Sequence, residues 1–124
     1  MKRKGSNAER ELVSMFAGIG WAAIRVAGSG SSKFPSPDVL VSNGNKVLAI
    51  ECKSTKHKYQ YFNPLQLKQL EEFASTFNAE PWLAIKFATD WKFFKPNDLA
   101  QKKKSFGVNK EHRDAKFFAD LARN

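Results

Sequence analysis

The sequence has one cysteine in 124 residues and no long apolar run. A disulfide framework needs paired cysteines and a thiolate zinc cluster needs several, so both are excluded. Apolar runs such as Trp82 to Ile85 are far too short to span a bilayer. The basic segment 1–6 is not followed by an apolar stretch, which excludes a signal peptide. We expect one globular domain over residues 1–124, located in the cytoplasm, with no membrane partner.

Acidic residues are scarce relative to basic ones. The chain has 21 Lys and Arg against 12 Asp and Glu, which gives a formal net charge of +9. Such an excess favours a polyanion such as nucleic acid as the partner, although lysine-rich surfaces are also common for solubility alone. Two groups of basic residues flank the acidic residues discussed below, which a purely solubilising role does not require. The candidate DNA-binding residues are Lys2, Arg3, Lys4, Arg10, Arg25, Lys33, Lys56 and Lys58.

The hydrophobic pattern predicts an α/β domain in which helices flank a mixed central sheet. Ser6 is a suitable N-cap for a first helix, which ends at Gly18. Asn63 as N-cap and Pro64 at the first helical position begin a second helix. Strands are expected over 21–27, 38–41, 47–53, 82–87 and 91–94, the second helix over 63–78, and a short helix within 111–123.

Chemistry-bearing residues gather around the third predicted strand. The Asn43-Gly44 turn predicts a hairpin between the second and third strands. Asp38 and Glu51 each lie about six residues from the centre of this turn, so the hairpin brings them close together. Lys53 shares the strand face of Glu51, because side chains alternate along a strand, while Cys52 points to the opposite, apolar face.

Two facing carboxylates repel each other unless a positive group lies between them. We expect Mg²⁺, with Mn²⁺ as a substitute, because hard cations of this kind take oxygen ligands. A bound ion polarises a phosphodiester, and Lys53 can stabilise the charge that develops on it. Asp38, Glu51 and Lys53 together therefore indicate metal-assisted phosphodiester hydrolysis.

Each of these residues also has a simpler interpretation. Glu51 and Lys53 form a solvated ion pair on the polar face of a strand in this alternative. Asp38 after a proline is also typical of a turn, and Glu9 occupies the third position of a capping box that Ser6 begins. Separately these signals are weak, and their ordered combination carries the prediction.

Bulky aromatic residues are abundant, with 11 Phe and 3 Trp. This is more than a small core must bury, so part of the set is expected at an interface. Trp91, Phe93 and Phe94 are the interface candidates, since they alternate poorly for a strand with one wet face. A strand buried on both faces explains the same pattern equally well.

Pro37-Asp38, followed thirteen residues later by Glu51-Cys52-Lys53, resembles the motif of the PD-(D/E)-x-K nuclease superfamily. The segments 3–12 (RKGSNAEREL) and 25–30 (RVAGSG) make the resemblance more specific, because they are similar to archaeal Holliday junction resolvases. The similarity extends over about residues 3–87, and the last part, 98–124, matches no pattern that we can place.

The resemblance implies a restriction-endonuclease-like fold with a mixed five-stranded sheet and a homodimer. It implies an endonuclease that resolves four-way DNA junctions by paired symmetric nicks during recombination and repair. The residues that match the family pattern are Glu9, Asp38 and Glu51 as metal ligands, Lys53 and Ser29 as further catalytic residues, and Arg10 and Arg25 in junction binding or cleavage.

Two other functions remain open at this stage. One is a basic DNA-binding module with an inactive metal site, against which the intact Asp38, Glu51 and Lys53 argue. The other is a nuclease of the same superfamily that cuts duplex DNA, for which 124 residues leave little room for a base-reading element. An RNA-binding module is less favoured, because no stacking motif of the usual sheet type is present.

Overall fold

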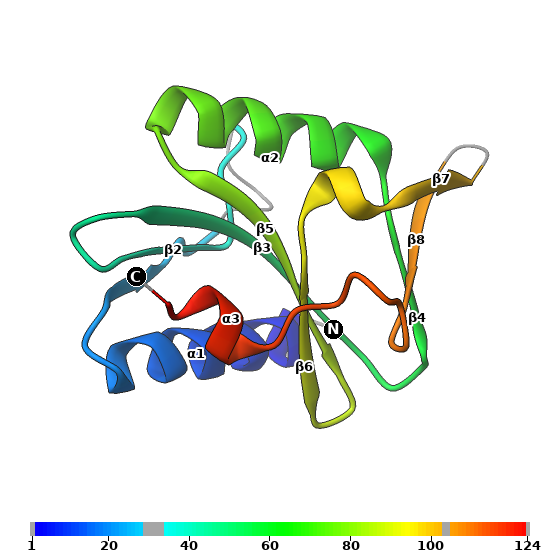
Figure 1. Cartoon of the computed structure of the whole chain (residues 1–124), viewed down its shortest axis with the longest axis horizontal. Helices are drawn as coiled ribbons and strands as arrows, with labels where there is room; N and C mark the ends of the chain where they lie inside the picture. Colours follow the sequence, from blue (N-terminus) through cyan, green and yellow to red (C-terminus); the bar gives the residue numbers. More distant parts are fainter. Residues whose placement is uncertain (1, 29–33, 103–104, 124) are drawn as a thin grey trace.

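The fold is built on a five-stranded mixed sheet, as predicted. The order of its strands is β1-β2-β3-β5-β6. The computed structural model describes residues 2–28, 34–102 and 105–123. Helix α1 lies against one face of this sheet and helix α2 against the other (Figure 1). The elements are α1 (Lys2–Gly18), β1 (Ala22–Arg25), β2 (Val39–Ser42), β3 (Val47–Thr55), α2 (Pro64–Phe77), β5 (Glu80–Phe87), β6 (Asp90–Phe94) and α3 (Phe118–Leu121).

A second, three-stranded sheet was not predicted. Its strands are β4 (Tyr59–Phe62), β8 (Ser105–Asn109) and β7 (Ala100–Lys102), in the order β4-β8-β7. A 3-10 turn at Pro96–Asp98 leads from the central sheet into β7. In Figure 1 this sheet lies at the right, where β4 connects β3 to the start of α2. We refer to it below as the small sheet.

The predicted hairpin between β2 and β3 is present. The two strands are antiparallel, with Val39 opposite Ile50. The side-chain oxygen of Asn43 accepts hydrogen bonds from the main-chain N–H groups of Asn45 and Lys46, both at 2.8 Å. Gly44 has φ +94°, a left-handed conformation that glycine adopts without steric cost. The turn therefore sets the register that the sequence predicts.

Helix α2 begins and ends where its capping residues predict. The side chain of Asn63 accepts a hydrogen bond from the N–H of Leu65 at 2.8 Å, and Gln66 completes the capping box. Asn78 closes the helix in a left-handed conformation with φ 61°.

Helix α1, in contrast, begins at Lys2 and not at Ser6. Glu9 therefore lies inside the helix, and the capping-box interpretation of Glu9 is wrong.

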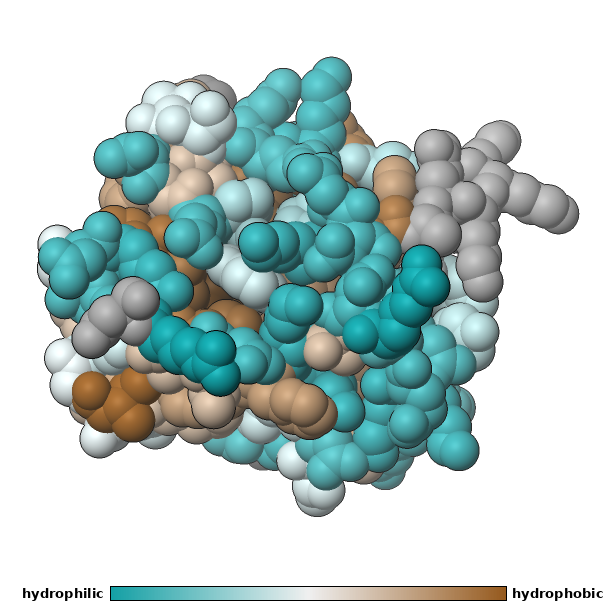
Figure 2. Space-filling view, viewed as in Figure 1, coloured by the Kyte–Doolittle hydropathy of each residue, from teal (hydrophilic) through white to brown (hydrophobic). Residues whose placement is uncertain are grey.

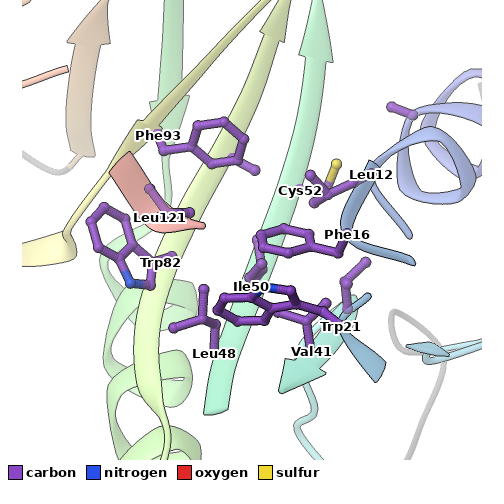
Figure 3. Packing of buried hydrophobic residues seen from close by; sticks show 13 residues of the cluster. Leu12, Phe16, Trp21, Val41, Leu48, Ile50, Cys52, Trp82, Phe93 and Leu121 are labelled. Atoms are coloured by element: carbon purple, nitrogen blue, oxygen red, sulfur yellow. The ribbon is translucent and has the colours of Figure 1, made fainter. Parts of the chain in front are cut away.

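Two apolar clusters hold the layers together, one on each face of the central sheet. Between α1 and the sheet, Phe16 packs its ring against Trp21 at 5.1 Å between centroids (Figure 3). Cys52 belongs to this cluster, as predicted, and burial raises the pKa of its thiol. The cluster on the α2 side includes Leu67, Leu70, Ala74, Leu83, Ile85 and Phe87.

The end of β6 is buried on both faces, so the prediction of an interface at Phe93 and Phe94 is wrong. Phe93 and Phe94 have no exposed surface and belong to opposite clusters. The main chain of Phe93 also exchanges two hydrogen bonds with Lys116, at 2.9 and 2.7 Å. Trp91 is half-buried and donates its ring N–H to Glu11 at 2.8 Å. The C-terminal segment therefore covers this edge of the sheet.

Hydrophilic residues cover most of the face drawn in Figure 2, and hydrophobic residues are exposed there only in small patches, one of them at the lower left. Among the described helices, none has both the length and the apolar content that crossing a membrane would need.

The buried position of Phe16 gives a test of this core. Replacement of Phe16 by alanine should lower the free energy of unfolding by about 3–5 kcal/mol, because the ring is fully buried. Phe117→Ala is the matched control, with an expected loss below about 1 kcal/mol, since Phe117 is 59% exposed. Urea unfolding followed by circular dichroism measures both. Equal losses would contradict the packing of α1 described here.

Candidate active site

Asp38 is fixed at the point where β1, β2 and β3 meet. Its main-chain N–H donates to the carbonyl of Ile50 at 3.0 Å, and its carbonyl accepts from the N–H of Val26 at 2.8 Å. Its side-chain Oδ2 accepts a third bond from the N–H of Cys52 at 2.9 Å. The side chain is buried, so these contacts leave it one orientation. Since Val39 is opposite Ile50, the next position along the ladder places Asp38 beside Glu51, as the hairpin predicts.

Glu51 lies in an environment that disfavours its negative charge. Burial raises the pKa of its carboxyl to about 8, and the charge of Asp38 acts in the same direction. The ammonium of Lys53 lowers this pKa, whereas a hydrogen bond with Asp38 and the charge of Glu9 raise it further. Near neutral pH, therefore, Glu51 keeps its proton unless a cation compensates the charge.

Glu9 approaches the same place from α1. Its Oε1 accepts a hydrogen bond from Nε of Arg25 on β1 at 2.8 Å, in a partly buried ion pair. Burial and the charge of Asp38 raise the pKa of Glu9, and the contacts with Arg25 and the charge of Arg10 lower it. The three carboxylates of Glu9, Asp38 and Glu51 thus lie within electrostatic range of one another.

Lys53 lies two residues after Glu51 on the same face of β3. Its Nζ lies 5.9 Å from the centre of the Phe62 ring, which belongs to the α2-side cluster. At this distance the ring and the ammonium are within range of a cation–π contact. The effect of Lys53 on the pKa of Glu51 reflects the proximity of the two side chains on β3.

The site suits a hard divalent cation, although its carboxylates are not yet arranged around one. In the described part of the chain, no three His, Cys, Asp or Glu side chains are placed to hold a metal ion. Glu9 is engaged by Arg25, and Asp38 and Glu51 share a hydrogen bond. Carboxylate oxygens are nevertheless the donors that Mg²⁺ takes, and a cation would relieve the repulsion that helps to raise the pKa of Glu9 and of Glu51. The residues present therefore fit such an ion through Asp38 and Glu51, with Glu9 joining them if it leaves Arg25.

The predicted basic residues are dispersed around this centre. Arg10 is exposed on α1 next to Glu9, and Lys56 and Lys58 are exposed in the turn between β3 and β4. Lys2, Arg3 and Lys4 lie in the first turn of α1, and the description does not extend to their side chains. Ser29 and Lys33 fall outside the described residues.

Two contributions to the site were not predicted from the sequence. The main-chain N–H of Cys52 anchors Asp38, and the ring of Phe62 supports Lys53. The first follows from the hairpin register, in which the position after Glu51 comes near Asp38. The second depends on β4, which was not recognised as a strand.

Pro37-Asp38 directly before β2 lies beside Glu51-Cys52-Lys53 on β3, which is the arrangement of a PD-(D/E)-x-K nuclease. The family model of the archaeal Holliday junction resolvase (Hjc) matches residues 1–124. The chain belongs to this family.

Known relatives resemble the chain over most of its length. The crossover junction endodeoxyribonuclease Hjc of Archaeoglobus fulgidus is 42% identical over 110 residues, which cover 88% of this chain and 81% of the relative. The crossover junction endodeoxyribonuclease Hje of Saccharolobus solfataricus is 42% identical over 96 residues, covering 74% and 71%. The solved structure of A. fulgidus Hjc, a Holliday junction resolvase, superposes with a TM-score of 0.89 at 36% identity and covers 96% of this chain and 100% of that one.

The raised pKa of Glu51 predicts a pH dependence of stability. As the pH rises from about 4.5 to about 8, the unfolded chain releases this proton while the folded protein retains it, so ionisation favours unfolding. Glu51→Gln has no ionisable group at this position. The free energy of unfolding of the variant, minus that of the wild type, should therefore increase from pH 4.5 to pH 8. Urea unfolding in EDTA at pH 5 and pH 8 measures the difference.

Glu11→Gln is the control for this measurement. Hydrogen bonds from Lys86 and Trp91 lower the pKa of Glu11, so its titration lies below that range. Its stability difference from the wild type should stay constant between the two pH values. A constant difference for Glu51→Gln as well would contradict the burial of its carboxyl.

Proposed function

We propose that this protein is a metal-dependent endonuclease that resolves four-way DNA junctions by paired symmetric nicks, in recombination and repair. The observation that carries the proposal is the convergence of Glu9, Asp38 and Glu51 beside Lys53. It is supported by membership of a family whose named relatives are crossover junction endodeoxyribonucleases. The work of such an enzyme on chromosomal DNA agrees with a cytoplasmic location.

The proposed roles follow from the positions of the side chains. Asp38 and Glu51 would hold Mg²⁺ or Mn²⁺, with Glu9 as the third acidic residue. When bound, the ion supplies a Lewis acid for the scissile phosphodiester. Lys53 would bind the same phosphate through its ammonium and stabilise the negative charge that develops during cleavage. Ser29 remains a predicted contact to the phosphate or to the attacking water.

Positive charge beside the carboxylates supports the choice of substrate. Arg10 and Arg25 lie next to Glu9, and Lys56 and Lys58 extend from the end of β3. These side chains would attract phosphate to a centre that is otherwise acidic, and Lys2, Arg3, Lys4 and Lys33 are proposed to add to the same binding surface. Phosphate contacts position DNA without reading its sequence, so selection by shape is expected.

A homodimer is part of the proposal. A four-way junction has two-fold symmetry, and two nicks on opposite strands require two equivalent active sites. Helix α2 supports an interface, because it exposes Leu65 (58%) and Phe77 (50%). Phe77 also stacks on Phe73, one turn earlier, with ring centroids 5.2 Å apart. A second copy would cover this apolar stripe.

The central experiment compares a labelled four-way junction with a linear duplex of the same sequence, in Mg²⁺ or in EDTA. We expect symmetric nicks in the junction only, and only with the metal.

Glu51→Ala should bind the junction with nearly unchanged affinity and cut it at least about a hundredfold more slowly. Lys53→Ala should bind the metal and cut slowly, because the charge on the phosphate is then less well stabilised.

Lys95→Ala is the matched control. Like Lys53, Lys95 lies over an aromatic ring, that of Trp82, with 5.6 Å from Nζ to the ring centre. Trp82 belongs to the α1-side cluster, whereas Phe62, under Lys53, belongs to the α2-side cluster. Its cleavage rate should equal that of the wild type. Junction binding without cleavage by the wild type would favour a DNA-binding module with an inactive site. Cleavage of the duplex as well would support the proposed nuclease activity and contradict its selectivity for junctions.

The dimer interface is tested with Phe77→Asp. A charge in the apolar stripe of α2 should produce a monomer, since burying an unpaired carboxylate in an interface is costly. Sedimentation equilibrium measures the mass. Phe117→Asp is the control, because Phe117 is exposed away from α2 and precedes α3, where aspartate is a favourable N-cap. A monomeric wild type, or a dimeric Phe77→Asp, would contradict this interface.

A further inference from the structure

The outer face of the small sheet carries two exposed tyrosines. Tyr59 is 42% exposed and Tyr61 is 55% exposed. They lie two residues apart on the same face of β4, and their rings are nearly parallel, with 6.1 Å between centroids and 13° between planes. Phe62, which points the opposite way, is 1% exposed. We call Tyr59 and Tyr61 the tyrosine pair.

The sheet itself leaves the ring of Tyr61 accessible. Across the sheet, Tyr61 is opposite Gly107, which has no side chain to cover the ring, and Tyr59 is opposite Asn109. Aromatic side chains on a sheet face usually pack against a covering layer, and an exposed ring such as that of Tyr61 is typical of a contact surface. A planar group laid on the exposed ring would extend the existing stack.

The charge around the tyrosine pair favours a polyanion. Lys56 and Lys58 are exposed directly before β4. The carbonyl of Lys58 accepts a hydrogen bond from the N–H of Lys110 at 2.8 Å, so a third lysine lies at this end of the small sheet. The nearby carboxylate of Asp90 is paired with Lys110 at 2.6 Å and does not offset the two lysines of the turn.

The small sheet is also continuous with the candidate active site. The ring of Phe62 contacts the ammonium of Lys53, and Tyr61 is the neighbouring residue on the outer face of the same strand. In Figure 1, β4 runs on directly from the turn after β3. Phe62 and Tyr61 point to opposite faces of β4, so Lys53 lies on the inner side of the small sheet and the tyrosine pair on its outer side. A DNA arm that runs from Lys53 past Lys56 and Lys58, in the turn between β3 and β4, would reach the outer face around this end of the strand.

From this arrangement we infer that the tyrosine pair stacks on a DNA base exposed at the branch point. The inference rests on the proposed function and adds a source of its selectivity. A continuous duplex covers both faces of every internal base, whereas a base at an open branch point has lost a stacked neighbour. Aromatic stacking therefore stabilises the junction complex and contributes nothing to binding an intact duplex.

The first test measures binding of a junction and of a duplex, in EDTA, by the full-length protein. Tyr61→Ala should weaken junction binding by about tenfold and leave duplex binding unchanged within about twofold. Tyr61→Phe keeps the ring and should bind like the wild type. Phe117→Ala removes an exposed ring elsewhere and should change neither affinity.

The second test removes the base and leaves the protein unaltered, so it does not depend on how a variant folds. Abasic sites are placed in turn at the nucleotides that flank the branch point. At one of these positions, the wild type should lose about tenfold in affinity. On that same junction, Tyr61→Ala should lose no more, because the base that its ring would contact is absent.

Besides normal junction binding by Tyr61→Ala, two outcomes would overturn the inference. One is an equal loss of junction and duplex affinity in Tyr61→Ala, which would indicate a general contact with phosphates. The other is additive losses from Tyr61→Ala and from every abasic site, which would mean that the ring and a base do not interact. Cleavage by the wild type separates this inference from the proposed function. A wild type that cuts the junction while Tyr61→Ala binds it normally refutes the stacking alone, and a wild type that cuts nothing refutes the proposed function.

Discussion

The repulsion between two neighbouring carboxylates, Asp38 and Glu51, is the constraint on which the site depends. The hairpin at Asn43 and Gly44 brings these side chains together, and the N–H of Cys52 fixes one of them. A shift of one residue in the register would turn Glu51 to the opposite face of the sheet. The turn therefore determines the site as directly as the acidic residues do.

The charges around this pair explain how a strongly basic chain keeps an acidic centre. Without a metal, a proton on Glu51 and the ion pair between Glu9 and Arg25 compensate the negative charge of the site. Both arrangements are reversible, because a divalent cation can replace the proton and compete with the guanidinium for Glu9. In the proposed function Arg25 binds a DNA phosphate, so substrate and metal would both act to separate it from Glu9.

The sequence was sufficient wherever a local interaction determines the structure. The hairpin turn and the Asn63 cap fall within a few residues of the elements that they define, and both predictions are confirmed. The start of α1 was wrong because the capping preference of Ser6, worth about 1 kcal/mol, does not stop a helix that can continue. The small sheet was missed because β4 pairs with β8, more than forty residues later, and its short strands show little pattern of their own. At β6, periodicity could not distinguish burial on two faces from an interface, and only the contacts of α3 and Lys116 decide it.

Selectivity for a junction cannot come from the carboxylates themselves. The phosphodiester that Asp38, Glu51 and Lys53 would act on is chemically the same in a junction and in a duplex. Discrimination must therefore come from surfaces that recognise what only a junction has, namely two-fold symmetry and bases without a stacked neighbour. The apolar stripe of α2 would match the two-fold symmetry by forming a dimer, and the tyrosine pair would bind a base without a stacked neighbour. Phe62 supports Lys53 from the inner face of β4, and the tyrosine pair occupies the outer face of the same strand. The proposed recognition of the branch point and the proposed positioning of Lys53 would therefore depend on one short strand.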